Sequence, residues 1–143
     1  MNKIEVIQGE LFSDHRGTIK SLNIFDFEGV QRMYTIEHPD PSVIRGWHGH
    51  QFERKWFCCI KGEFNLAFVQ PDNWDNPSPL LLPELFTLTE INSKIICLPA
   101  GFANCIKATQ PNSILLVLSD VKYEECLKDS WRWEPEMWNG ISL

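Results

Sequence analysis

The sequence predicts one all-β domain, a barrel or jelly roll built from roughly nine or ten short strands. Short segments rich in strand-forming residues alternate with turn signals that contain Gly, Pro, Asn or Asp. No segment before residue 121 has a helical period sustained over about eleven residues. The chain of 143 residues fits a single domain spanning 1–143, and its 43% hydrophobic residues can supply one core.

The first half of the chain holds five predicted strands. A turn at Asp14-His15 precedes the first of them, and His38-Pro39-Asp40-Pro41 separates the second from the third. Lys61-Gly62 predicts a tight hairpin between the fourth and the fifth. These strands are expected at 16–23, 31–37, 43–50, 55–60 and 63–70.

The second half begins with a loop at 71–83 that is rich in Pro, Asn and Asp. Strands are expected at 85–90 and 94–98, with a turn at 91–93 between them. The segment 114–118 (ILLVL) is continuously apolar, which is typical of a strand buried on both faces. Residues 123–127 can form a helical turn.

Composition excludes several classes of function. The net charge of -6 and the lack of a Lys/Arg cluster argue against nucleic-acid binding. No apolar run approaches the roughly 20 residues of a membrane-spanning helix, and the first residues lack the apolar stretch of a signal peptide. The five cysteines include no CxxC pair and are expected to be buried thiols. We therefore expect a cytoplasmic protein.

The segment Arg45-Gly46-Trp47-His48-Gly49-His50 carries the strongest functional signal. Residues two apart on a strand project from the same face, so both histidines point together, with Arg45 towards the other end of the segment. Three interpretations are open: two half-exposed polar residues, a metal site, or acid–base chemistry. Gly46 and Gly49 would let a ligand approach the backbone. Trp47 can stack on a base or sugar, or belong to the core.

The segment from Gly46 to Gly62 resembles the first motif of the cupins, small β-barrels of the jelly-roll type. Metal-binding cupins carry a glutamate that six residues separate from the hairpin glycine, where this chain has Lys55, and a histidine where it has Asn104. Because an ammonium repels a cation, we expect no metal and no other cofactor.

Among cupins, the chain resembles the RmlC-like branch, typified by dTDP-4-dehydrorhamnose 3,5-epimerase. The matching pieces are Asp14-His15-Arg16-Gly17, Arg45-Gly46-Trp47-His48, Lys55, Pro99-Ala100-Gly101-Phe102-Ala103 and the Trp-rich segment from Trp131 to Trp138. The resemblance implies that His48 is the general base. Lys55 can then stabilise the enolate oxygen. Arg16 and Arg45 are candidates for binding the diphosphate.

Two features depart from the epimerases. Leu116 stands at the position of their tyrosine acid, and the aspartate that pairs with their histidine lies in a C-terminal extension that this chain lacks. The related sugar 3,4-ketoisomerases (FdtA, WxcM-like) resemble the chain in R-G-x-H-x-H, and they carry a tyrosine on the preceding strand, which Tyr34 matches. His48 with Tyr34 could then move one proton and His50 the other. Asn104 breaks the second motif of that group and becomes a candidate substrate contact.

We therefore predict a metal-independent isomerase or epimerase that acts on a nucleotide-linked 4-keto-6-deoxyhexose, a dTDP-sugar. A 3,4-ketoisomerase and a cupin that binds nucleotide sugar without catalysis are the alternatives. A dioxygenase-type cupin, which would need iron, is a further rival. The resemblance also implies a homodimer, with the N-terminal strand as a candidate for exchange between subunits.

Overall fold

A computed structural model describes residues 3–138. The elements, in chain order, are β1 (Glu5–Gln8), β2 (Glu10–Asp14), β3 (Gly17–Ser21), β4 (Arg32–His38), β5 (Ile44–His50), β6 (Lys55–Lys61), β7 (Glu63–Val69), β8 (Glu84–Thr89), β9 (Lys94–Leu98), β10 (Phe102–Ala108), β11 (Ser113–Ser119), α1 (Tyr123–Cys126) and β12 (Trp131–Arg132).

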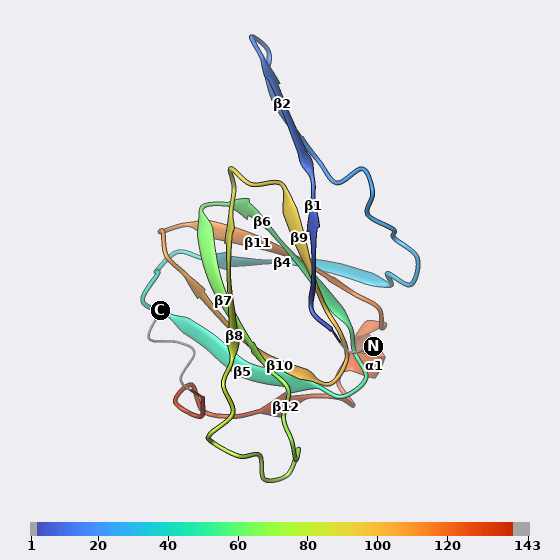
Figure 1. Cartoon of the computed structure of the whole chain (residues 1–143), viewed down its shortest axis with the longest axis vertical. Helices are drawn as coiled ribbons and strands as arrows, with labels where there is room; N and C mark the ends of the chain where they lie inside the picture. Colours follow the sequence, from blue (N-terminus) through green and yellow to red (C-terminus); the bar gives the residue numbers. More distant parts are fainter. Residues whose placement is uncertain (1–2, 139–143) are drawn as a thin grey trace.

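Two antiparallel five-stranded sheets face each other (Figure 1). The strand order is β1-β9-β6-β11-β4 in one sheet and β12-β5-β10-β7-β8 in the other. Neighbours in each sheet are mostly not consecutive in the chain, which is the pattern of a jelly roll. The predicted all-β, cupin-type jelly-roll fold is therefore confirmed.

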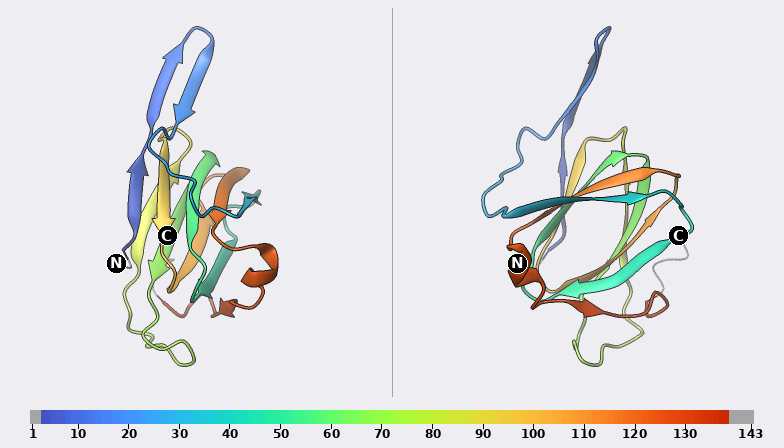
Figure 2. Two further views of the ribbon diagram at one scale, coloured as in Figure 1. Left: turned by 90° about the vertical axis from the view of Figure 1, so that its right-hand side faces the viewer. Right: turned by 180° about the vertical axis from the view of Figure 1, so that it is seen from behind.

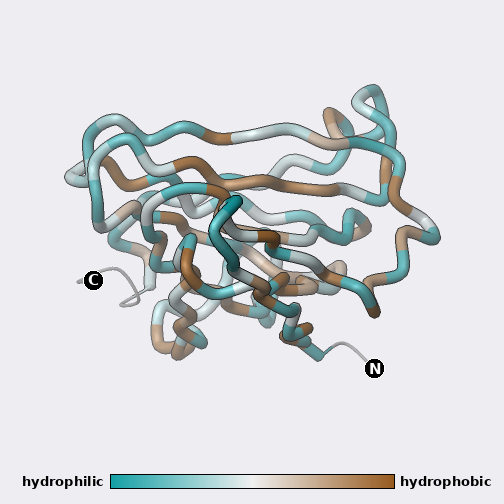
Figure 3. Tube along the Cα trace, turned by 90° about the horizontal axis from the view of Figure 1, so that it is seen from above, coloured by the Kyte–Doolittle hydropathy of each residue, from teal (hydrophilic) through white to brown (hydrophobic). Residues whose placement is uncertain are grey.

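The main core lies between the two sheets. Buried side chains from both of them meet there, including Phe57, Phe64, Phe68, Leu115 and Val117. Strand β4 shows the pattern that produces this layer, because half-buried and exposed residues alternate along it. Figure 3 shows that hydrophobic and hydrophilic stretches, in brown and teal, follow one another along the chain.

Strands β2 and β3 form a separate hairpin that projects away from the two sheets (Figures 1 and 2). Its side chains are mostly exposed, among them the apolar Leu11, Phe12 and Ile19. At the opposite end of the chain, α1 and β12 run along the edge of the second sheet, where β12 pairs with β5. This pairing sets the C-terminal segment directly beside the histidine strand.

All eight predicted strands exist, with ends that differ by a residue or two from those expected, and the helical turn at 123–127 is α1. Strands β1, β2, β10 and β12 were not predicted. No helix among residues 3–138 is long and apolar enough to cross a membrane.

Candidate active site

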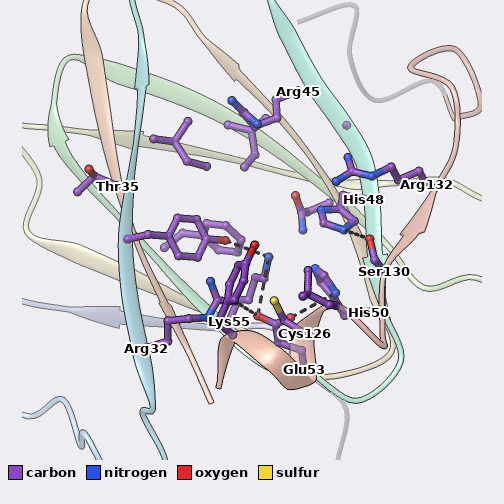
Figure 4. A pocket seen from close by; sticks show the side chains of 18 of the residues that line it. Arg32, Thr35, Arg45, His48, His50, Glu53, Lys55, Cys126, Ser130 and Arg132 are labelled. Atoms are coloured by element: carbon purple, nitrogen blue, oxygen red, sulfur yellow. Dashed lines mark hydrogen bonds and ion pairs between the residues drawn. The ribbon is translucent and has the colours of Figure 1, made fainter. Parts of the chain in front are cut away.

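A cavity of about 510 Å³ opens between the two sheets, at the end that carries α1 (Figure 4). This volume suits a small-molecule ligand. Six of the eight predicted site residues line it: Tyr34, Arg45, His48, His50, Lys55 and Asn104. They come from β4, β5, β6 and β10, so both sheets contribute to one site.

An irregularity in β5 brings Arg45 onto the same side as the histidines. Residues three apart on a regular strand face opposite ways, which would separate Arg45 from His48. The pairing with β10 shifts here: Asn104 lies opposite His48, whereas the next residue, Cys105, lies opposite Gly46. Trp47 therefore has no opposite residue in the pairing of β5 with β10. As a result, Arg45, His48 and His50 all line the cavity.

Gly46 and Gly49 serve packing rather than ligand approach. A Cβ on Gly46, whose φ is 149°, would lie 2.8 Å from the Cα of Cys105. A Cβ on Gly49 would lie 2.8 Å from ring atoms of both Trp74 and Trp133. The Cβ side of each glycine is therefore filled by the protein, although the backbone of Gly46 still lines the cavity.

His48 is held by the C-terminal segment, because its Nε2 lies 3.0 Å from the Oγ of Ser130. Burial is the main cause that lowers the pKa of His48 to about 3, with further contributions from the charges of His50, Lys55, Arg132 and Arg45. His48 is thus a neutral imidazole near pH 7, the form that can accept a proton.

His50 is more deeply buried and has a defined tautomer. Its Nδ1 lies 2.6 Å from the backbone carbonyl of Asp129, and a carbonyl only accepts, so Nδ1 carries the proton. The lone pair of His50 is then on Nε2, a buried atom without a hydrogen-bond partner in the described part of the chain. Burial, followed by the charge of Lys55, lowers the pKa of His50. The centres of the imidazole rings of His48 and His50 lie 4.3 Å apart.

The carboxylate of Asp129 fixes the turn between β5 and β6. It accepts hydrogen bonds from the backbone N–H groups of Gln51, Phe52 and Glu53, at 2.7, 2.8 and 3.1 Å. With its own carbonyl on His50, Asp129 therefore holds both the end of the histidine strand and the start of β6.

Lys55 and Tyr34 form a hydrogen-bonded pair of proton donors in the cavity. The ammonium of Lys55 donates to the hydroxyl of Tyr34 over 3.0 Å, and Lys55 is only 6% exposed. The guanidinium of Arg32 lies 5.0 Å from the centre of the Tyr34 ring. Such donors can protonate and stabilise a developing enolate oxygen.

Four cations line the cavity in total: Arg32, Arg45, Lys55 and Arg132. In Figure 4, Arg45 and Arg132 lie on the His48 side, and Arg32 lies near Lys55 and Glu53. Guanidinium groups bind phosphate oxygens in bidentate geometry, so Arg45 and Arg132 are suited to a diphosphate. Within residues 3–138, no group of three or more His, Cys, Asp or Glu side chains is placed to hold a metal ion.

Two predicted substrate contacts lie elsewhere. Trp47 is 1% exposed and packs edge-on against Trp138, on the face of the second sheet that is turned away from the cavity, so its assignment to a stacking role is wrong. Arg16 lies at the tip of the projecting β2–β3 hairpin, where its side chain pairs with Asp14. The structure does not bring Arg16 to the cavity of its own chain.

Several site residues were missed by sequence reasoning. Arg32, Ser130 and Arg132 line the cavity, and Asp129 holds its wall. None of them belongs to a motif quoted above for catalysis, and the last three lie about 80 residues from the histidines. Leu116, at the position of the epimerase tyrosine, does not line the cavity and packs beside Trp56.

The sequence profile of the FdtA family, described as WxcM-like, C-terminal, matches residues 2–132. The chain belongs to this family. No curated protein matches the sequence significantly.

Solved structures similar to this chain share its fold. The 3,4-ketoisomerase QdtA from Thermoanaerobacterium thermosaccharolyticum, solved as a variant with TDP-4-keto-6-deoxyglucose, has 20% identity and a TM-score of 0.71 over 93% of this chain and 89% of its own. The TDP-quinovose 3,4-ketoisomerase WlaRB from Campylobacter jejuni has 18% identity and a TM-score of 0.70, covering 96% and 98%. ChmJ, a 3'-monoepimerase from Streptomyces bikiniensis solved with dTDP-quinovose, has 17% identity and a TM-score of 0.77, covering 98% and 74%.

Proposed function

We propose that this protein is a metal-independent isomerase that moves a proton next to the keto group of a dTDP-4-keto-6-deoxyhexose. The observation that carries the proposal is the convergence of His48, His50, Tyr34 and Lys55 in one cavity. The chemistry of the ligands bound to the similar structures, TDP and dTDP-sugars, supports the same substrate class.

The pair of histidines favours 3,4-ketoisomerisation. In the first half of that reaction, a neutral histidine takes the proton from C3 while the C4 carbonyl oxygen receives one from the Tyr34–Lys55 pair, which gives an enediol. In the second half, the C3 hydroxyl returns a proton to the oxygen of Tyr34 as the C3 carbonyl forms, and C4 receives a proton from a histidine. The phenol thus gives one proton and takes one back, while the two imidazoles serve the proton transfers at C3 and C4.

Epimerisation is the second candidate, because Lys55 occupies the position of the lysine in the epimerase family. Both reactions begin with loss of a proton next to the keto group, and they differ in where a proton returns. For the diphosphate, the structure suggests Arg45 and Arg132, while Asn104, 5% exposed and paired with His48 across β5 and β10, would contact the sugar.

Proton NMR with dTDP-4-keto-6-deoxyglucose in deuterium oxide tests the proposal. Deuterium incorporation together with a 3-keto product is the expected result, whereas exchange at C3 or C5 with a 4-keto product would identify an epimerase. Saturable binding without any exchange would refute catalysis and leave a nucleotide-sugar-binding protein. Metal analysis of the purified protein checks the iron-dependent rival.

We also propose a homodimer formed through the N-terminal segment. The β2–β3 hairpin exposes Leu11, Phe12 and Ile19, at 51%, 57% and 62%, on an element with no core of its own. A second copy that covers these side chains removes apolar surface from water. The variant Phe12→Asp with Ile19→Asp should sediment as a monomer, while the control Leu80→Asp, at an exposed apolar position outside the hairpin, should not change the assembly.

A further inference from the structure

One buried carboxylate in the wall of the cavity takes no part in the mechanism described above. Glu53 is 2% exposed, although a glutamate buried to this extent is costly unless it is paired. It also falls two residues before the position at which metal-binding cupins carry their glutamate, so the cupin motif does not account for it.

The partners of Glu53 come from four strands. Its Oε2 accepts hydrogen bonds from the Oγ of Ser119 on β11, at 2.6 Å, and from the guanidinium of Arg32 on β4, at 3.1 Å. The ammonium of Lys55 on β6 lies 4.0 Å from the same oxygen. On the other side, Oε1 lies 3.3 Å from the Nδ1 of His50 on β5. Figure 4 shows Glu53 between His50 and Lys55.

We propose that Glu53 is a positioning residue of the isomerase site, the buried counter-ion that keeps Lys55 and Arg32 in place and favours the protonated state of His50 over that of His48. This inference rests on the proposed function for its kinetic readout. Under this proposal the two histidines have different tasks, although they lie on the same strand and at neighbouring positions.

The geometry separates the two imidazoles. His50 lies beside the carboxylate, whereas the hydrogen-bond partner of His48 is the uncharged hydroxyl of Ser130. The titratable and charged groups that face His50 are Glu53, Asp129, Lys55 and His48. Glu53 and Asp129 raise the pKa of His50 against the lowering by burial and Lys55, and no carboxylate among residues 3–138 does the same for His48. A proton shared by the pair therefore resides on His50, which leaves His48 as the base for the first transfer.

The carboxylate of Glu53 also holds Lys55 and Tyr34, the proposed proton donors of the site, in place. Lys55 reaches both Glu53 and the hydroxyl of Tyr34, so the anion, the ammonium and the phenol form a chain. Without the anion, the buried ammonium of Lys55 and the half-buried guanidinium of Arg32 would repel each other, and Lys55 would lose the charge that opposes its movement away from Tyr34.

The variant Glu53→Gln, which keeps the shape and removes the charge, tests this role. We expect kcat for substrate exchange to fall about 10- to 100-fold, while the dissociation constant for dTDP stays within about threefold, since the arginines of the mouth remain. The acid limb of the pH profile should move to lower pH, because the anion that favours protonated His50 is gone. Glu53→Asp should recover part of kcat. Glu90→Gln, which neutralises a carboxylate bonded to the backbone of Gly62 outside the cavity, is the matched control and should match the wild type.

A second readout does not depend on activity. NMR titration of the His50 ring, assigned with His50→Gln, should give a lower pKa in Glu53→Gln than in the wild type and an intermediate pKa in Glu53→Asp. Unchanged kcat and pH profile in Glu53→Gln, or an unchanged titration of His50, would overturn the inference. So would a parallel loss of dTDP binding and thermal stability, which indicates a purely structural role. If the wild type binds dTDP-sugar without exchange, the proposed function fails, and the titration still decides the role of Glu53.

Discussion

Replacement of Asp129 by alanine should destabilise the fold more than any other single change to a polar residue of the site. Its carboxylate accepts three backbone N–H groups and is buried, at 7% exposed. The N–H of Glu53 belongs to a buried residue and would lose its partner outright, a cost of about 2–3 kcal/mol. The N–H groups of Gln51 and Phe52 lie in more exposed residues, where water can replace the carboxylate at a cost of about 0.5–1 kcal/mol each.

The expected loss in the free energy of unfolding is therefore about 3–5 kcal/mol. For a domain of this size, each kcal/mol lowers Tm by about 3 °C, so Tm should fall by about 10–15 °C. Urea unfolding followed by tryptophan fluorescence measures the change, and Asp129→Asn should lie between the wild type and Asp129→Ala because it keeps one acceptor oxygen. Asp40→Ala removes an exposed carboxylate that caps the backbone of Ser42, and it should cost less than about 1 kcal/mol. Equal losses for Asp129→Ala and Asp40→Ala would refute the reasoning.

Three further predictions concern the cavity and its wall. His48→Ala should slow solvent exchange into the substrate by about 10²–10⁴-fold with the dTDP dissociation constant little changed, as measured by NMR and calorimetry. The pKa of His48 is about 3 in the fold and about 6.5 in the unfolded chain, so the stability contributed by its neutral form is complete above pH 6.5 and is lost as the pH falls towards 3. Between pH 7 and 4, the free energy of unfolding should therefore fall more steeply for the wild type than for His48→Gln. Trp47→Ala should cost about 3–5 kcal/mol of stability through the cavity that it leaves. Trp47→Phe should bind dTDP as the wild type does. Weakened dTDP binding in Trp47→Phe would show that the indole of Trp47 does contribute to the ligand site.

The strands that could be predicted are those with a local signature. Lys61-Gly62 marks a hairpin, and the continuous run at 114–118 lies in β11, an inner strand of the first sheet between β6 and β4. Strand β10 was missed because residues 102–108 follow the conspicuous P-x-G motif and lack both alternation and a long aliphatic run, and their burial depends on β5 and β7 on either side. Strand β12 has only two residues and exists through its pairing with β5. No local propensity encodes such a strand.

In the site, too, the sequence predicted the features that depend on local pattern and missed those that depend on distant contacts. Strand parity predicted that His48 and His50 point together, and the motif resemblance placed Lys55 and Tyr34 with them. The position of Arg45 on the side of the histidines depends on the irregularity opposite Cys105, which parity alone cannot reveal. The hydrogen bond between Ser130 and His48 joins residues 82 positions apart. The C-terminal segment thus supplies a hydrogen-bond partner for His48.

The charges of the cavity would link binding of a diphosphate to the basicity of the histidines. Four cations and two carboxylates line the cavity of a chain whose net charge is -6, so positive charge is concentrated in the cavity. After burial and His50, the cations Lys55, Arg132 and Arg45 further lower the pKa of His48. A diphosphate that pairs with Arg45 and Arg132 would cancel part of that effect.

The size of this coupling can be worked out from Coulomb's law. One negative charge about 8 Å away contributes about 2 kcal/mol at an effective dielectric constant near 20, which raises a pKa by about 1.5 units. The pKa of His48 would then rise from about 3 to between about 4 and 5. Binding of dTDP at pH 5 should take up a fraction of a proton, measurable by calorimetry in buffers of different ionisation enthalpy, and this uptake should shrink in His48→Gln. Proton release on binding would contradict the argument. Proton uptake would mean that the substrate, by arriving, adjusts the base that acts on it, so that His48 is a stronger proton acceptor in the complex than in the free protein.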